Sequence, residues 1–214
     1  VHNVRGTHSN GISVYSSGNN PANNTNNVVS YCDLYNILTP ITYEYGSNLD
    51  FIGNLVDAAG EEQSINEWGG CAGTIRWIGN TIVNRGGGSG GTLRIGNGGA
   101  DTTYVLINNI IDGGGLGATV PNVTRSNNIY LSRAWWQDSG TGWELGTDEV
   151  DVTDPDTLFV SPATRDWRLK AGSVAIDAGI DPTSYYAVGN DLDDEARPAG
   201  AAWDIGAYEY GSGT

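Results

Sequence analysis

The residues with the most useful chemistry alternate along four short stretches of sequence that we predict to be β-strands. These stretches are Gly11–Tyr15, Pro40–Glu44, Ser64–Trp68 and Gly91–Ile95. Successive side chains of a strand point to opposite faces, so the neighbours of inward apolar residues point outward. We therefore expect one outward row of Ser13, Thr42, Asn66 and Arg94, and a second outward row of Tyr15, Glu44 and Trp68.

Such a face has the chemistry of a sugar-binding surface. Aromatic rings stack on the C–H face of a sugar, while amide, hydroxyl and charged groups bind its hydroxyls. The pattern predicts a carbohydrate-binding face, and the alternative is an ordinary solvated surface. The residues that we expect to contact the glycan are Tyr15, Glu44, Asn66, Trp68 and Arg94.

A run of carboxylates near the C-terminus offers a second kind of chemistry. Asp191, Asp193 and Glu195 alternate along the chain, and Ca²⁺ takes about six to eight oxygen ligands of this kind. The run lacks the glycine and the distal glutamate of an EF-hand loop. Calcium is one prediction for this run. The other, which we favour, is a structural role in the C-terminal segment, where Arg168 and Arg197 would pair with Asp177, Asp193 or Asp204. We predict no other cofactor.

Strand–turn–strand units recur along the first two thirds of the chain. Their turn residues Asp33, Asn54, Asn80, Asn109 and Asn128 are 21, 26, 29 and 19 residues apart. A period of roughly 20–50 residues indicates a repeat architecture. Three short strands per repeat, joined by glycine and asparagine turns, predict an all-β fold, a right-handed parallel β-helix of about five coils.

Stacked coils bring equivalent side chains together in columns. We expect two interior apolar columns, one of Ile12, Ile41, Ile65 and Leu93 and one of Tyr31, Ile52, Ile78 and Ile107. The turn residues should form a hydrogen-bonded ladder with a structural role. Its expected members are Asp33, which would place a charge at one end, and Asn54, Asn80, Asn109 and Asn128.

The composition argues against several classes of partner. A net charge of −15 in 214 residues disfavours nucleic acid, whose phosphates require Lys and Arg, and anionic membrane surfaces. No apolar run approaches the ~18 residues that span a bilayer, so we predict no membrane insertion. The chain begins at Val1 without Met, which predicts a mature or excised fragment whose targeting segment is absent here.

The two cysteines are predicted to be free. Cys32 and Cys71 fall two coils apart in the predicted stack, an offset of about 9–10 Å along the axis. A disulfide needs Cα atoms within about 7 Å.

Residues 132–214 lose the repeat and carry the most specific motifs of the chain. Asp166–Gly179, Asp191–Pro198 and Trp203–Tyr210 resemble the C-terminal segment of secreted bacterial right-handed β-helix proteins. These proteins carry D-x-R-L-x-x-G-S-P-A-I-D-A-G, then D-x-D-G-x-x-R-P, then D-I-G-A-Y-E, whereas this chain has Val174 for the usual proline and Asp194 for the usual glycine. Some are pectate-lyase-like or otherwise active on polysaccharides. The resemblance implies fold and location, and it transfers no catalytic residue.

Catalysis has little support in the sequence. Lyases on this fold use a lysine or arginine base, and the single lysine, Lys170, lies in the C-terminal motif. Arg76 and Arg94 remain as candidate bases. The N-T-D, D-D, G-H-G and R-I-K signatures of polygalacturonase-like β-helices are missing, and His2 and His8 lie at the N-terminus, where a solvated loop is the simpler interpretation.

The predicted organisation is a β-helix over residues 1–131 and a capping segment over residues 132–214 that covers the open end of the solenoid. Trp135, Trp136 and Trp143 are expected to pack within this cap. We predict a secreted or cell-surface module of bacterial type, structural, adhesive or carbohydrate-binding and non-catalytic as it stands. One alternative is a polysaccharide lyase or glycoside hydrolase, or the C-terminal part of one. The other is a self-assembling filament subunit that pairs through its N-terminal coil.

Overall fold

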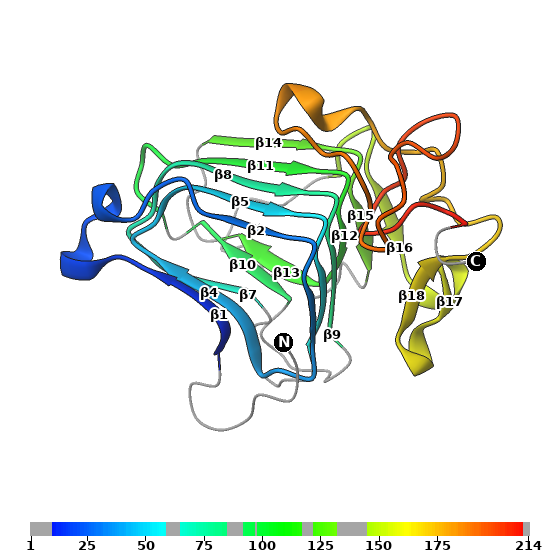
Figure 1. Ribbon diagram of the computed structural model, residues 1–214, viewed down its shortest axis with the longest axis horizontal. Helices are drawn as coiled ribbons and strands as arrows, with labels where there is room; N and C mark the ends of the chain where they lie inside the picture. The colour runs from blue at the N-terminus through cyan, green and yellow to red at the C-terminus, as the bar shows by residue number, and fades with distance from the viewer. Residues whose placement is uncertain are drawn as a thin grey trace.

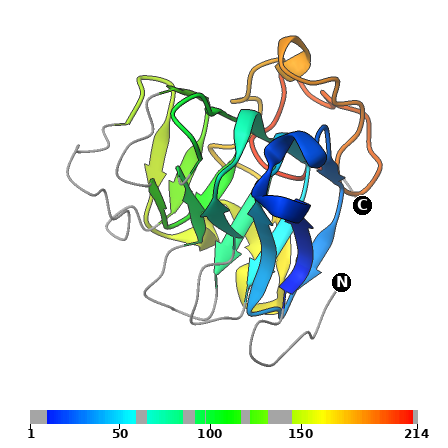
Figure 2. The ribbon, with the colours of Figure 1, turned by 90° about the vertical axis from the view of Figure 1, so that its left-hand side faces the viewer.

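The chain winds into a parallel β-solenoid in which each turn adds a strand to each of three parallel sheets (Figure 1). The computed structural model describes residues 10–58, 65–84, 92–96, 98–116, 122–131 and 145–211, with side chains omitted at 114–116. The helical elements of this described part are 3₁₀ turns of three residues. A view turned by 90° shows successive turns side by side, from the first, blue strands to the later, green ones (Figure 2).

The three sheets have five, five and six strands. The first sheet contains β1 (Asn10–Tyr15), β4 (Thr39–Glu44), β7 (Ile65–Gly69), β10 (Leu93–Ile95) and β13 (Gly114–Leu116). The second sheet contains β2 (Val28–Ser30), β5 (Ser47–Ile52), β8 (Ala72–Ile78), β11 (Thr103–Ile107) and β14 (Asn122–Ser126). The third sheet contains β3 (Asp33–Tyr35), β6 (Leu55–Ala58), β9 (Thr81–Asn84), β12 (Ile110–Asp112), β15 (Ile129–Leu131) and β16 (Val150–Val152).

The corner between the second and third sheets explains the glycine and asparagine of the repeat. The corner residues have positive φ in every turn, and they are Tyr31 (51°), Gly53 (60°), Gly79 (63°), Asn108 (56°) and Asn127 (51°). Glycine and asparagine adopt this left-handed conformation at little cost, which lets the chain turn sharply and keeps both flanking strands short. Tyr31 is the exception in the series.

The interior confirms the first predicted column. Ile12 pairs in register with Ile41, Ile41 with Ile65, and Ile65 with Leu93. All four contribute to one core, in which Phe51 and Trp77 stack with ring centroids 3.9 Å apart. Aliphatic columns and stacked aromatic rings therefore fill the inside of the solenoid.

The second predicted column forms, but it points outward. Ile52, Ile78 and Ile107 are buried under Ile180, Tyr185, Tyr186 and Val188 of the C-terminal segment, and Tyr31 remains 39% exposed. Alternation explains the difference, because Phe51 and Trp77 already occupy the inward positions of their strands. The prediction that this column is interior was wrong.

The asparagine ladder is confirmed for Asn54, Asn80, Asn109 and Asn128. Each Oδ1 from Asn80 onward accepts from the backbone N–H and the side-chain amide of the preceding ladder residue, at 2.9–3.0 Å. Each Nδ2 also donates to a carbonyl of the second sheet at 2.8 Å, as Asn80 does to Phe51. All four side chains are buried, so the ladder satisfies amides that the strands do not reach.

The two ends of the ladder differ from the prediction. Asp33 pairs with Leu55 in the third sheet, and the residue that donates its backbone N–H to Asn54 Oδ1 is Cys32, at 3.0 Å. The assignment of Asp33 to the ladder was therefore wrong by one residue. At the other end, Asn128 Nδ2 donates to Glu149 Oε1 at 3.0 Å, so a buried glutamate terminates the ladder.

The C-terminal segment lies along the side of the solenoid, next to the third sheet (Figure 1). Its antiparallel strands β17 (Phe159–Ser161) and β18 (Asp166–Leu169) belong to a core that joins it to the outer face of that sheet. This core includes Leu55, Val83, Ile110, Ile129, Leu158, Phe159, Trp167, Leu169 and Ile205. Strand β16 extends the stack after β15. The described residues after β16 therefore pack against a flank of the solenoid. The predicted cap over the open end stays a prediction, because residues 132–144 lie outside the described ones.

One arginine joins this segment to the first turns. Arg165 Nε donates to the buried carboxylate of Asp57 at 2.7 Å, and its Nη2 pairs with Asp33 at 2.8 Å. The guanidinium also lies over the ring of Tyr35, 3.7 Å from the centroid. Trp167 Nε1 donates to the same Asp57 oxygen at 3.1 Å. Asp57 therefore connects the hairpin to the solenoid.

Both cysteines are free, as predicted, with Cys71 buried and Cys32 partly buried. Within the described ranges, no helix is long and apolar enough to cross a membrane.

Candidate functional site

The first predicted row on the outer face of the first sheet is in register. Ser13 pairs with Thr42, Thr42 with Asn66, and Asn66 with Arg94. The hydroxyls of Ser13 and Thr42 are 3.2 Å apart, and the Tyr15 hydroxyl donates to Thr42 Oγ1 at 3.2 Å. These contacts bring Tyr15 towards the first row.

A β-bulge alters the second row. Tyr15 pairs with Glu44, but Glu44 pairs with Gly69 because the register shifts after Tyr43. Trp68 is the extra residue of this bulge, and bulges commonly redirect a side chain on a sheet face. Trp68 is 55% exposed and Tyr15 is 46% exposed. The face therefore presents two aromatic side chains to solvent.

Most of the polar residues of this face are less exposed than the sequence suggested. Thr42 and Asn66 are buried, while Ser13 and Arg94 are exposed and Glu44 is half-buried. Asn66 Oδ1 is buried and has no hydrogen-bond partner among the described residues. A buried acceptor without a partner is uncommon in folded proteins.

A buried carboxylate lies behind this face. Glu67, between Asn66 and Trp68, points inward, where its two oxygens accept from the Tyr104 hydroxyl at 2.9 and 2.8 Å. Gly96 N–H donates to Glu67 Oε2 at 2.7 Å. Burial and the Glu67 charge raise the pKa of Tyr104 and of Tyr43 well above their usual values. Glu67 was not predicted as a buried group, although the alternation that places Ile65 inward also places Glu67 inward.

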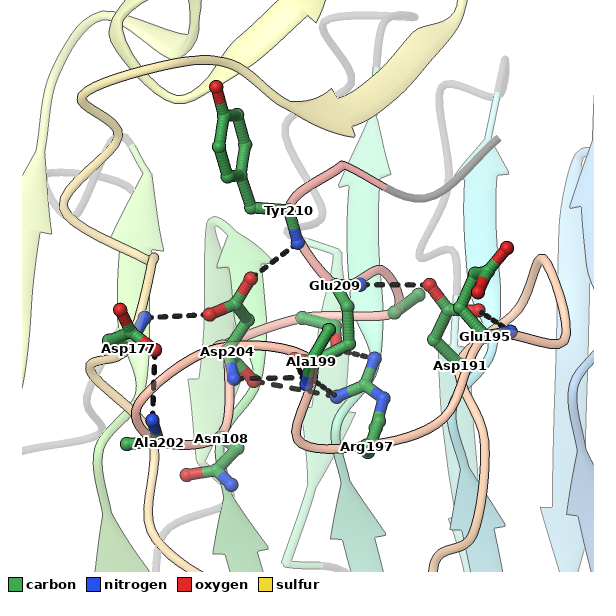
Figure 3. Close-up of polar contacts among 12 residues, drawn as sticks. Asn108, Asp177, Asp191, Glu195, Arg197, Ala199, Ala202, Asp204, Glu209 and Tyr210 are labelled. Atoms are coloured by element: carbon green, nitrogen blue, oxygen red, sulfur yellow. Dashed lines mark hydrogen bonds and ion pairs between the residues drawn. The ribbon is translucent and has the colours of Figure 1, made fainter. Parts of the chain in front are cut away.

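The acidic run forms a turn held by backbone amides (Figure 3). Asp191 Oδ1 accepts from the N–H groups of Asp193 and Glu195, both at 2.9 Å. Its Oδ2 accepts from Glu209 N–H, also at 2.9 Å. Among the residues that the structure places, no group of three or more His, Cys, Asp or Glu side chains is arranged to hold a metal ion. Calcium at Asp191, Asp193 and Glu195 stays a prediction.

The arginines of the segment divide between buried and exposed pairs. Arg197 is buried, donates to Gly206 O at 2.7 Å and lies 3.5 Å from Glu209. Arg168 forms a two-point pair with Asp166, which lowers the pKa of that carboxyl mainly through the side-chain hydrogen bonds. Both arginines form ion pairs, as the sequence predicted, and these include Arg168 with Asp166 and Arg197 with Glu209.

We expect the stability that Asp204 and Glu209 contribute to fall as the pH rises above about 4, the ordinary pKa of a carboxyl group, and through their raised folded pKa values. Burial raises the pKa of Asp204 and of Glu209 above their usual values, although backbone N–H groups partly oppose the shift. At a pH between the two pKa values of such a group, the folded state holds a proton that the unfolded state has released. The stabilisation from this proton is therefore fully present below the unfolded pKa and is lost as the pH rises through the folded pKa. Calorimetry across this range should show a falling Tm, with a shallower slope for Glu209→Gln. A Tm that rises with pH would contradict this expectation.

The other predicted residues lie apart from the face. Arg76 pairs with Asp50 at 2.7 Å on the second sheet, and Lys170 donates to the carbonyl of Asp156. The two histidines and the three clustered tryptophans lie outside the described residues. They are His2, His8, Trp135, Trp136 and Trp143.

Comparison with known proteins adds no function. A scan against models of protein families finds no match for this chain, and a search of curated proteins finds no significant relative. The parallel β-solenoid is therefore established by the structure alone, and the resemblance of the C-terminal motifs to secreted β-helix proteins stays a prediction.

Proposed function

We propose that this chain is an extracellular carbohydrate-binding module built on a right-handed β-helix of about five coils. The observation that carries the proposal is the pair of exposed aromatic side chains, Tyr15 and Trp68, on one face of a rigid parallel sheet. Exposed aromatic residues beside hydrogen-bonding groups mark binding surfaces. The C-terminal motifs support an extracellular location.

The face suits an extended glycan. Tyr15 lies on β1 and Trp68 on β7, with β4 between them, so the strands that carry the two rings are about 9–10 Å apart. Glu44 of β4 lies between the two rings, because it pairs with Tyr15 on one side and with Gly69, next to Trp68, on the other. The row of Thr42 and Asn66 runs alongside. Sugar rings would stack on Tyr15 and Trp68 while hydroxyls between them donate to the half-buried Glu44 carboxylate. Arg94, on β10 beyond the strand of Trp68, lies at the margin of this contact.

Trp68→Ala is expected to weaken glycan binding by about tenfold or more, because stacking on an exposed ring is lost. Tyr15→Ala should have a smaller effect in the same direction. Binding to a glycan array followed by calorimetry on the best ligand measures both. The matched control is Tyr210→Ala, which removes an aromatic ring of similar exposure, 46%, from the C-terminal segment. Equal affinities for Trp68→Ala and the parent protein would rule out this face.

A further inference from the structure

A pocket lies at the corner between the second and third sheets, away from the face that carries Trp68. It has a volume of about 480 Å³ and is lined by Tyr31 and by Gly189, Asn190, Asp191, Leu192 and Asp194 of the C-terminal segment. Small-molecule pockets commonly have volumes of about 300–1,000 Å³. We propose that this pocket binds a neutral pyranose unit stacked on Tyr31. The inference goes beyond the proposed function, because it depends on neither Trp68 nor Tyr15.

The backbone at Tyr31 is the first argument. Tyr31 has φ 51° at a corner where the other turns carry glycine or asparagine. A bulky side chain in this conformation is an outlier, and such outliers cluster at ligand-binding sites. The four equivalent residues are Gly53, Gly79, Asn108 and Asn127. The corner itself therefore does not require a tyrosine.

The position of the ring is the second argument. A Cβ atom added to Gly53 would lie 2.8 Å from the Tyr31 ring, so the ring packs against this glycine in the next turn. The Tyr31 side chain nevertheless remains 39% exposed and lines the pocket. Burial also raises the pKa of its phenol, so the ring stays uncharged at neutral pH. A neutral aromatic ring that packs against the next turn and is partly exposed can stack on the C–H face of a sugar.

The polar groups around the ring define the ligand. Asn190 Nδ2 donates to Asp194 Oδ1 at 2.7 Å, which fixes an amide and a carboxylate at the mouth of the pocket. These groups are the usual partners of sugar hydroxyls. Asp191 holds the loop through its three backbone contacts. The loop carries Asp191, Asp193, Asp194 and Glu195, so a ligand with its own carboxylate would be repelled. The chemistry therefore favours a neutral sugar over a uronic acid.

The experiment uses the full chain, a panel of neutral gluco-, manno-, galacto- and xylo-hexasaccharides, and a hexagalacturonate as the acidic comparison. Amide chemical shifts should change at Gly189–Asp194 with at least one neutral hexasaccharide and not with the acidic one. Trp68→Ala should leave these shifts intact, which separates this pocket from the sheet face. Shifts confined to the acidic probe, or no shifts at Gly189–Asp194 with any probe, would overturn the proposal.

Tyr31→Asn provides the decisive variant, since asparagine occupies the same corner in two other turns. It should weaken binding at this pocket at least tenfold while Tm stays equal or rises, because the strained tyrosine is gone. Asp194→Gly is a second variant, because Asp194 has φ 69° and glycine adopts this conformation freely. It should weaken binding several-fold with the fold intact. If both variants bind within twofold of the parent protein, the pocket is not a sugar site.

Discussion

Replacing Asn80 by alanine is expected to lower the free energy of unfolding by about 3–5 kcal/mol, a large effect for a single side chain. The Asn80 amide makes four hydrogen bonds in the middle of the ladder. Its Oδ1 accepts from the backbone N–H and the Nδ2 of Asn54, both at 3.0 Å. Its Nδ2 donates to Phe51 O at 2.8 Å and to Asn109 Oδ1 at 2.9 Å. Alanine leaves these buried partners unsatisfied and opens a cavity.

Urea unfolding monitored by circular dichroism measures this loss. The matched control is Asn122→Ala on β14, because Asn122 is exposed and its side chain makes one long contact, 3.5 Å, to Ala100 O. The control should change stability by no more than about 0.5 kcal/mol. A loss below about 1 kcal/mol for Asn80→Ala would show that the ladder is a consequence of the fold and not a source of its stability.

The ladder also shows what the sequence predicts well. Asn54, Asn80, Asn109 and Asn128 were identified because a solenoid places equivalent residues of each repeat next to one another. The same logic identified the interior column that contains Ile41 and Ile65. Because each structural position occurs once in every turn, several residues support its assignment. A chance match in one turn then has little effect on the prediction.

Errors arose where two neighbouring residues could fill the same position of the repeat. Asp33 was placed in the ladder because it is polar, although the residue before it, Cys32, holds the equivalent position and has no amide side chain. Ile78 was placed inside because Trp77 and Ile78 are both apolar, and alternation allows only one of two neighbours to point inward. The C-terminal segment covers Ile78, and no local pattern in the repeat reveals that cover.

The candidate face was predicted only in part, because the repeat sets the register of its strands but not their irregularities. Registers such as Thr42 with Asn66 follow from the repeat. The bulge at Trp68 does not, because it depends on one extra residue in a single strand. The pocket at Tyr31 combines a corner residue of the first turn with a loop more than 150 residues later in the sequence. Contacts across such a distance leave no trace in the spacing of either segment.

Asp57→Ala is expected to detach the C-terminal segment from the first turns and to cost about 3–5 kcal/mol. Asp57 is fully buried, and its Oδ2 accepts from Arg165 Nε at 2.7 Å and from Trp167 Nε1 at 3.1 Å. Its removal leaves a partly buried guanidinium without its closest partner and an indole N–H without an acceptor, beneath the hairpin of β17 and β18. Strands β17 and β18 should then detach from the third sheet by local unfolding more often than the solenoid itself unfolds.

Limited proteolysis tests this separation, because the flank should be cleaved between residues 155 and 211 while the solenoid core survives. Asp33→Ala is the matched control, since Asp33 binds the same arginine at 2.8 Å but its side chain is 45% exposed. An exposed pair is worth at most about 1 kcal/mol, so this variant should resist the protease like the parent chain. In the double variant Asp57→Ala/Arg165→Ala, the two losses should be less than additive, because the second substitution removes the unpaired charge that the first one created. Equal protease sensitivity of Asp57→Ala and Asp33→Ala would instead place the attachment in the apolar contacts of Trp167 and Ile205 with the third sheet.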